Sequence, residues 1–158
     1  MADIRVGIGF DAHALADGVP LVLGGVGFDS RRGLAGHSDG DVVTHALIDA
    51  VLGAAGLGDI GSLFPSDGST PEGISSLELL RDALSQVRAA GYVLVNADCV
   101  LVGEEPRIAP RREEMERTLG DVVGAPVSVR ATTTDGLGFT GRGEGLAAQA
   151  VALLERPA

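Results

Sequence analysis

The sequence predicts an α+β fold: one domain, residues 1–158, in which a mainly β-sheet layer packs against helices. Segments that alternate between apolar and polar residues, as strands do, are interspersed with segments whose apolar residues recur at helical spacing. No linker, repeat or low-complexity tract divides them, and a chain of 158 residues can bury a core of its own. Because the first two apolar segments are expected to pair as a hairpin, α+β is favoured over α/β.

Strands are expected in four places. Residues 4–10 alternate, and residues 20–28 contain a short apolar run, LVLGGVGF, interrupted by glycines as turns or bulges would be. These two segments form the expected hairpin. Residues 92–102 alternate again, and residues 127–131 present Val127, Val129 and Ala131 on one face of a later strand.

The first helix is expected over residues 41–56, where apolar residues lie on nearly every side, as in a helix buried all round. Ser38 or Asp39 can cap its start. Residues 58–73 are rich in Gly, Pro, Ser and Asp and have no periodicity. They are expected to form the longest loop, of the kind that often acts as a lid.

Three further helices are expected. Residues 74–87 carry apolar side chains at helical spacing and end before Gly91, a typical C-terminal glycine. Pro110 suits the first turn of a helix that continues through RREEMERTL. The last helix is expected over residues 143–155.

Charge and composition exclude several classes of protein. The formal net charge is −10, with 22 acidic residues against 12 basic ones, all of them arginine. A nucleic-acid-binding surface needs dense basic patches, so no nucleic-acid partner is expected. No membrane association is expected either, because no apolar run is long enough and the N-terminal residues lack the features of a signal peptide. The single cysteine, Cys99, cannot form an internal disulfide, which indicates a cytoplasmic location.

Asp11 and His13 lie two residues apart at the end of the first expected strand. Side chains two apart in a strand leave the backbone on the same side, so both can reach one ion. This spacing is weak evidence by itself, because strand ends commonly carry polar residues.

Asp41, His45 and Asp49 are spaced so that they stack along one face of the first expected helix. A buried histidine held by a neighbouring acid would account for this pattern without any metal. The alternative is a metal-binding histidine whose second ring nitrogen is oriented by an acid such as Asp49.

Together, Asp11, His13 and His45 make a set of two histidines and one carboxylate. Three such ligands leave one position of a zinc ion open for substrate, as in catalytic zinc sites. A structural zinc site would be expected to use cysteines.

Residues 130–145, RATTTDGLGFTGRGEG, offer hydroxyls, backbone N–H groups and glycines that let an anion approach closely. Such a segment suits a phosphate, although glycine-rich turns are also ordinary structure. Two phosphates brought together repel strongly, and this chain has few arginines to offset their charge. Divalent metals on the three ligands above and on Asp135 would do so.

Five segments occur together in this order: GFDAH, HSDGDVVTHALIDAVLGAAGLGDIG, LFPSD, EPRIAP and RATTTDGLGFTGRGEG. This set is far more specific than any single motif, and it resembles the 2-C-methyl-D-erythritol 2,4-cyclodiphosphate synthase family over essentially the whole chain. The resemblance implies a metal-dependent phosphorus–oxygen lyase of isoprenoid precursor biosynthesis. It would cyclise 4-diphosphocytidyl-2-C-methyl-D-erythritol 2-phosphate to the 2,4-cyclodiphosphate and release CMP. It also implies a homotrimer whose active sites lie between subunits, one subunit supplying the zinc ligands and its neighbour the cytidine pocket.

The resemblance further implies a role for each residue that matches the family's motifs. The three ligands above would hold Zn²⁺, and a second divalent cation, Mg²⁺ or Mn²⁺, would lie near Asp135. His37 and Thr133 would be catalytic residues that stabilise the transition state, and Ser38 would help to hold the attacking phosphate. The residues expected to contact the cytidine diphosphate substrate are Asp11, Ala12, His13, His37, Ser38, Asp59, Ile60, Gly61, Phe64, Pro65, Ser66, Asp67, Gly68, Gly103, Glu104, Glu105, Pro106, Arg107, Ile108, Ala109, Thr132, Thr133, Thr134, Asp135, Phe139 and Arg142.

Four positions depart from the family pattern. Asp135 stands where glutamate is usual, Ser66 where aspartate is frequent, and Arg107 and Gly136 where lysines are common. Arg107 keeps the positive charge but not the point geometry of lysine. These departures concern the grip on substrate rather than the zinc ligands.

Two alternatives to this function are considered. The first is a non-catalytic trimeric binder of nucleotides or isoprenoid diphosphates that shares the fold. The second is a fusion with the cytidylyltransferase of the pathway, but a second domain is not expected in 158 residues. Release of CMP from the cytidyl substrate distinguishes the enzyme from the binder.

Overall fold

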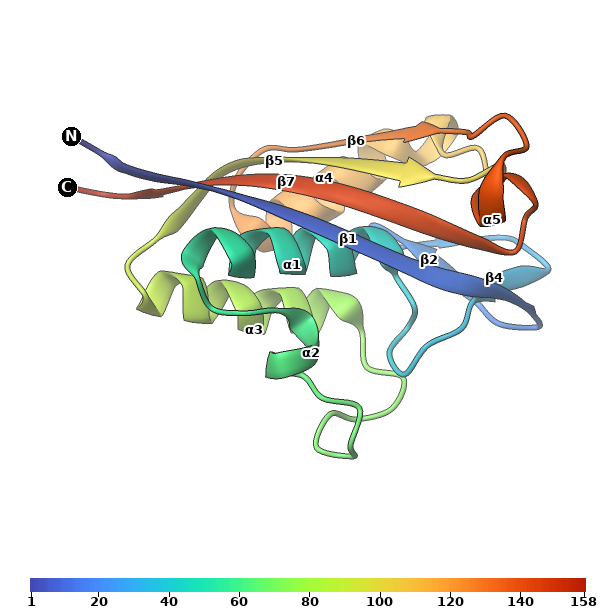
Figure 1. The fold of residues 1–158 in the computed structure, drawn as a ribbon, viewed down its shortest axis with the longest axis horizontal. Coiled ribbons are helices and arrows are strands. Elements are labelled where there is room, and N and C mark those ends of the chain that lie inside the picture. The colour runs from blue at the N-terminus through green and yellow to red at the C-terminus, as the bar shows by residue number, and fades with distance from the viewer.

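The computed structural model describes residues 1–158 and is built on a five-stranded sheet (Figure 1). The strands are β1 (Asp3–Asp17), β2 (Leu21–Leu23), β3 (Val26–Phe28), β4 (Arg32–Leu34), β5 (Val93–Val102), β6 (Val127–Thr132) and β7 (Gly145–Arg156). The sheet order is β4-β1-β7-β5-β6, and β2 and β3 form a separate two-stranded hairpin. Neighbouring strands are antiparallel except β5 and β6, which are parallel.

Helices cover one face of this sheet, so the expected α+β arrangement of a sheet layer packed against helices is confirmed (Figure 1). The helices are α1 (Val42–Ala55), α2 (Ile60–Leu63), α3 (Ser76–Ala89), α4 (Arg112–Val123) and α5 (Gly138–Gly141), with a 3₁₀ turn at Ala109–Arg111. Helix α1 packs on β1 and β7, α3 packs on α1, and α4 packs on β6. None of the helices is both long and apolar enough to traverse a bilayer.

The hairpin expected from the first two apolar segments is wrong. Strand β1 is longer than its alternation indicated, and it pairs with β7 from Asp3 to Ala14 and then with β4. Residues 21–28 fold back on themselves around Gly24 and Gly25, which both adopt positive φ. Glycine is the residue that tolerates this conformation, so β2 and β3 form the hairpin alone.

The last expected helix, residues 143–155, is also wrong, because this segment is β7, the central strand of the sheet. Its alanines and leucines favour helices when considered locally. Pairing with β1 on one side and β5 on the other overrides that preference. The alternation was present in the sequence: Ala148, Ala150 and Ala152 are buried, whereas Gln149 and Val151 between them are exposed.

The start of α1 is capped by Asp41, not by Ser38 or Asp39 as expected. The Asp41 carboxylate accepts a hydrogen bond from the Thr44 backbone N–H at 3.1 Å and others from the N–H groups of Gly24 and Gly25. This fully buried acid therefore ties the β2–β3 turn to the first turn of α1.

Helix α1 lies unusually close to β1 because two glycines of the strand face it. A Cβ added at Gly9 would collide with the backbone carbonyl of Ala46, and one at Gly7 with that of Ala50. Across the strand pair, Gly9 lies opposite Ala150 and Gly7 opposite Ala152. This floor of glycine and alanine lets the helix backbone rest almost directly on the sheet.

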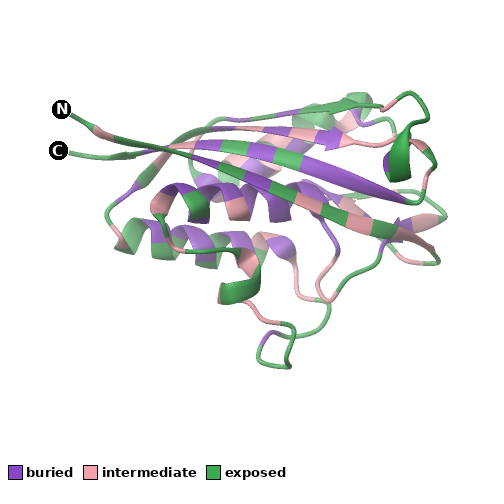
Figure 2. Ribbon diagram, viewed as in Figure 1, coloured by how far each residue is buried: buried purple, intermediate pink, exposed green.

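The opposite face of the sheet exposes large apolar side chains. Exposed residues are coloured green on the ribbon in Figure 2, where they alternate with less exposed ones along the strands. Successive residues of a strand point to opposite faces, so this set alternates with the buried positions of β1. We call it the exposed apolar face, and its members are Ile4, Val6, Ile8 and Phe10 on β1 and Val151 on β7, which pairs with Ile8.

Replacing Gly9 with alanine is expected to destabilise the protein by about 1–3 kcal/mol or more, because the added methyl group forces α1 away from the sheet. Replacing Gly53, an exposed glycine inside α1, is the matched control. A Cβ there meets only the Ile8 carbonyl oxygen at 3.9 Å, so Gly53→Ala is expected to stabilise by up to about 1 kcal/mol. Urea denaturation of both variants measures the two changes, and equal effects would contradict the close contact.

Candidate functional site

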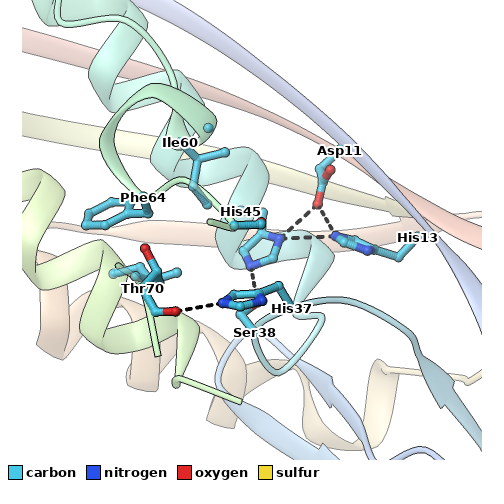
Figure 3. A pocket seen from close by; sticks show the side chains of 11 residues that line it. Asp11, His13, His37, Ser38, His45, Ile60, Phe64 and Thr70 are labelled. Atoms are coloured by element: carbon cyan, nitrogen blue, oxygen red, sulfur yellow. Dashed lines mark hydrogen bonds and ion pairs between the residues drawn. The ribbon is translucent and has the colours of Figure 1, made fainter. Parts of the chain in front are cut away.

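Asp11, His13 and His45 converge on one point between β1 and the first turns of α1 (Figure 3). Asp11 Oδ2 lies 2.8 Å from His13 Nε2 and 3.0 Å from His45 Nδ1, and the two nitrogens are 3.2 Å apart. Asp11 and His13 lie on the same face of β1, as the spacing of two residues predicted, and this face meets the helix. The predicted convergence of the three side chains is therefore confirmed.

The hydrogen bonds of His13 show which of its ring atoms faces the group. Its Nδ1 lies 2.8 Å from the carbonyl oxygen of Ala35. A carbonyl only accepts hydrogen bonds, so Nδ1 carries the proton and donates it. In the neutral ring, Nε2 then presents a lone pair toward Asp11 and His45.

This triangle fits a divalent cation. Its edges of 2.8, 3.0 and 3.2 Å are close to the roughly 3.3 Å that separates ligands around tetrahedral zinc with bonds of about 2.0–2.1 Å. Atoms that carry lone pairs or negative charge repel at these separations unless a cation or a proton lies among them. The donor set, two imidazoles and one carboxylate, is the kind that divalent transition metals bind.

The pKa values of Asp11 and His13 reflect the same crowding. Burial raises the pKa of Asp11, but the neighbouring His13 and His45 outweigh burial and bring the value down to about 2. The hydrogen bond to Asp11 raises the pKa of His13 above its usual value, against an opposing effect of burial.

Of Asp41, His45 and Asp49, which were expected along one helix face, only His45 lies at the site. Asp41 caps the helix, and Asp49 accepts a hydrogen bond from the Ile60 N–H at 2.8 Å, which fastens α2 to α1. Asp49 therefore does not orient His45, contrary to the prediction. The second ring nitrogen, His45 Nε2, instead lies 2.9 Å from Ser38 Oγ and 2.8 Å from Ser76 Oγ.

A cavity of about 190 Å³ opens beside the triangle, and we call it the Asp11 cavity (Figure 3). Its lining combines polar groups with three apolar side chains. These are Ile60 in α2, Phe64 directly after α2, and Leu79 in α3. Sequence reasoning missed Thr70 and Leu79, which carry no motif and reach the cavity only through the path of the chain. Its lining residues are Asp11, His13, His37, Ser38, His45, Ile60, Gly61, Phe64, Ser66, Thr70 and Leu79.

His37 holds the long loop against the cavity. Its Nε2 lies 2.7 Å from the carbonyl oxygen of Thr70, and its own carbonyl accepts a hydrogen bond from the Gly73 N–H at 2.7 Å. Nε2 therefore donates to Thr70, which leaves Nδ1 of the ring available to a ligand.

Other expected contacts of this region lie outside the cavity lining. Asp59 caps α2 by accepting hydrogen bonds from the N–H and hydroxyl of Ser62, both at 2.8 Å. Ala12 alternates with its neighbours, so its side chain points to the opposite face of the sheet. The loop residues Pro65, Asp67 and Gly68 do not line the cavity either.

A second cavity, of about 600 Å³, lies at the ends of β5 and β6, and we call it the Arg107 cavity. It brings together the EPRIAP segment and the threonines at the end of β6, as the family resemblance implied. Arg112 and Arg130, which also line it, were not foreseen there. Its lining residues are Gly103, Glu104, Pro106, Arg107, Ile108, Ala109, Arg112, Arg130, Ala131, Thr132 and Thr133, none of which lines the Asp11 cavity.

The remaining candidates do not line the Arg107 cavity. Asp135 adopts a positive φ of 53° and accepts a hydrogen bond from the Thr133 hydroxyl at 3.2 Å. It belongs to no group of three potential metal ligands, since Asp11, His13 and His45 form the only such group. Arg142 is exposed and pairs with Glu144 at 3.0 Å. Glu105, Thr134 and Phe139 also lie outside the lining.

Comparison with known proteins extends over nearly the whole chain. The model of the YgbB family matches residues 4–155. A 2-C-methyl-D-erythritol 2,4-cyclodiphosphate synthase of Moorella thermoacetica is 52% identical over 154 residues, which cover 96% of this chain and 94% of that protein. The synthase of Clostridium acetobutylicum is 46% identical over 154 residues, covering 96% and 99%.

Solved structures are similar in fold as well as in sequence. The bifunctional IspDF of Campylobacter jejuni matches with a TM-score of 0.95 and 39% identity, covering 99% of this chain and 43% of that one. The IspF of Plasmodium falciparum, in complex with CDP, matches with a TM-score of 0.85 and 30% identity, covering 98% and 97%.

Binding of a metal ion to the triangle is expected to weaken as the pH falls through the raised pKa of His13. Below that pKa the ring holds a proton that the ion must displace, and above it the site is free. At a pH below that pKa, about one proton is therefore expected to be released per Zn²⁺ bound. Calorimetry in buffers with different ionisation enthalpies counts these protons. An affinity that is unchanged between about pH 5.5 and 7.5, the range around the ordinary histidine pKa, would contradict the assignment.

Proposed function

This chain belongs to the YgbB family of 2-C-methyl-D-erythritol 2,4-cyclodiphosphate synthases, and we propose that it is a metal-dependent phosphorus–oxygen lyase of isoprenoid precursor biosynthesis. It cyclises 4-diphosphocytidyl-2-C-methyl-D-erythritol 2-phosphate to 2-C-methyl-D-erythritol 2,4-cyclodiphosphate and releases CMP. The observation that carries this proposal is the convergence of Asp11, His13 and His45 at the edge of a cavity that also contains His37 and Ser38.

Asp11, His13 and His45 hold the first divalent cation, which we assign as Zn²⁺ because imidazole and carboxylate ligands suit it. A cation bound there polarises a phosphoryl oxygen and offsets the charge of the diphosphate. A second divalent cation, Mg²⁺ or Mn²⁺, is proposed near Asp135. A single carboxylate suits such an ion, because magnesium in particular is commonly bound by one or two carboxylates plus substrate phosphates.

The residues beside the triangle orient the reacting phosphates. Ser38 and His37 line the same cavity as the metal ligands, where the 2-phosphate attacks the β-phosphorus. Because Thr70 fixes the His37 ring through Nε2, a protonated ring would present its Nδ1–H to a phosphate oxygen. Thr133 contributes its hydroxyl from the other cavity. Both residues act by stabilising negative charge that develops in the transition state.

The Arg107 cavity is proposed to bind the cytidine end of the substrate. Arg107, Arg112 and Arg130 line it together with one carboxylate, Glu104. Arg130 also forms an ion pair with Asp98, so Arg107 and Arg112 are the guanidinium groups left for a ligand. Guanidinium groups bind phosphates and stack on planar rings, so this chemistry suits a nucleotide. Structures of relatives in complex with CDP support the same class of ligand.

We propose that the active protein is a homotrimer whose sites lie between subunits. The two cavities share no lining residue within one chain, although the substrate must meet groups from both. The exposed apolar face supports an assembly, since Ile4, Val6 and Ile8 are each at least 60% exposed. Contiguous apolar surface of this kind marks interaction sites.

Residues 1–158 are proposed to act as one catalytic domain in the cytoplasm. A single apolar core cluster runs through the chain, from the β2–β3 hairpin to β7. The only cysteine, Cys99, is buried and unpaired, as expected in a reducing compartment.

The enzyme is tested by measuring CMP release from the cytidyl substrate with zinc and magnesium present. The wild-type chain is expected to release CMP. Losing a residue that orients a metal ligand typically costs about 10–100-fold in activity. Because His45→Ala removes a ligand itself, its CMP release is expected to slow by more than that. Ser75→Ala is the matched control, because this serine makes no side-chain cap hydrogen bond at the start of α3. Wild-type release no faster than that of His45→Ala would favour a non-catalytic binder instead.

Val6→Asp is expected to dissociate the trimer, because it places a charge in the middle of the exposed apolar face. Ser85→Asp, on the exposed side of α3, is the matched control that adds the same charge elsewhere. Light scattering after size-exclusion chromatography measures the mass of each variant, and circular dichroism checks that both are folded. A monomeric wild type, or a trimeric Val6→Asp, would contradict the proposed assembly.

A further inference from the structure

A buried polar chain lies behind His45, on the side away from Asp11. His45 Nε2 is 2.8 Å from the hydroxyl of Ser76, and that hydroxyl in turn makes a short contact with the Asp39 carboxylate. Ser76 is fully buried at the start of α3, and His45 is only 7% exposed. These residues come from three separate segments, so only the fold brings them together.

Asp39 is held in place by backbone groups of two helix starts. One carboxylate oxygen accepts a hydrogen bond from the Ser76 N–H at 3.0 Å, and the other from the Asp41 N–H at 3.1 Å. The Asp39 N–H donates to the carbonyl of Ile74 at 3.1 Å. The carboxylate is therefore fixed against Ser76 at the N-terminus of α3, where the helix dipole favours negative charge.

The direction of the hydrogen bonds in this chain is determined by counting protons. An ionised carboxylate only accepts, so the single hydroxyl proton of Ser76 goes to Asp39. The Ser76 oxygen then has only lone pairs to offer to His45, and Nε2 must carry a proton and donate it. Neutral imidazole carries one proton, so Nδ1 of His45 is left with a lone pair directed at Asp11 and His13.

We infer that Ser76 and Asp39 are positioning residues that set the tautomer of His45 and so present its Nδ1 lone pair to the metal site. They touch neither the ion nor the substrate and act through the imidazole. Partners of this kind behind a metal-binding histidine fix the orientation of the ring and raise its basicity as a ligand. The inference deepens the proposed function, because it rests on the metal site formed by Asp11, His13 and His45.

Ser38 is the competing partner, since its hydroxyl is also 2.9 Å from His45 Nε2. Ser38 lines the Asp11 cavity, is partly exposed, and has no carboxylate behind it. Its hydroxyl proton is free to turn toward a ligand, so Ser38 imposes no direction on the hydrogen bond. Ser76, in contrast, can only accept from His45.

The tautomer is tested directly by ¹⁵N NMR of the imidazole rings in the metal-free protein, at a pH where the rings are neutral. The chain has only three histidines, so each ring can be assigned by replacing one at a time. His45 of the wild type is expected to carry its proton on Nε2. In Ser76→Ala the proton is expected to move substantially to Nδ1, where Asp11 accepts it, whereas Ser38→Ala and Ser75→Ala are expected to keep the wild-type tautomer.

Metal retention provides the second measurement. Competition with a chromophoric chelator is expected to show Zn²⁺ affinity about 10–100-fold weaker in Ser76→Ala than in Ser75→Ala, the neighbouring control. The visible spectrum of Co²⁺ in the same two variants reports ligand geometry and is expected to change only in Ser76→Ala. A variant that folds by circular dichroism yet keeps the wild-type tautomer and Zn²⁺ affinity would overturn the inference, as would a tautomer shift in Ser38→Ala alone.

These outcomes are distinct from failure of the proposed function. A wild-type protein that binds no Zn²⁺ removes the metal site itself, whatever the tautomer of His45. A wild type that binds Zn²⁺ and releases CMP, with Ser76→Ala equal to Ser75→Ala in every measurement, leaves the enzyme standing and removes only the role of Ser76 and Asp39.

Discussion

The contact between α1 and the sheet is the constraint on which the rest of the structure depends. Gly7 and Gly9 have no side chains on the face that the helix meets, and Ala150 and Ala152 beside them are small. The helix backbone can therefore approach β1 more closely than ordinary side chains allow. The Ala46 carbonyl lies against Gly9, and His45 is the residue before Ala46. The same contact therefore brings the His45 ring to 3.0 Å from the Asp11 carboxylate.

That close approach creates a site whose facing atoms repel one another. Three atoms with lone pairs or negative charge lie within 2.8–3.2 Å of one another. The hydrogen bonds around them direct the protons of both imidazole rings away from the point where the three atoms face each other. The Ala35 carbonyl accepts a hydrogen bond from His13 Nδ1 on one side, and the Ser76 hydroxyl oxygen accepts one from His45 Nε2 on the other. A preformed arrangement of this kind favours a cation, because no rearrangement of the ligands is needed to bind it.

The sheet that carries the metal ligands on one face carries apolar side chains on the other. Alternation along β1 places Asp11 and His13 toward the helix and Val6, Ile8 and Phe10 outward. One strand therefore serves both the site and the proposed contact between subunits. The two cavities share no lining residue within one chain. In the proposed trimer, the Asp11 cavity of one subunit would therefore lie beside the Arg107 cavity of its neighbour.

Local patterns in the sequence determined that Asp11 and His13 share one side of β1 and determined the extent of α1, because strand and helix periodicities depend on neighbouring residues only. The segments that line each cavity were expected only from the resemblance of their motifs to a known family. Tertiary structure alone decided that the alanine-rich segment 145–156 is a strand, because pairing on both sides outweighs a weak helical preference. It also decided the roles of Asp39, Asp49 and Ser76. Their hydrogen-bond partners lie on other segments, and no spacing along the chain encodes such distances.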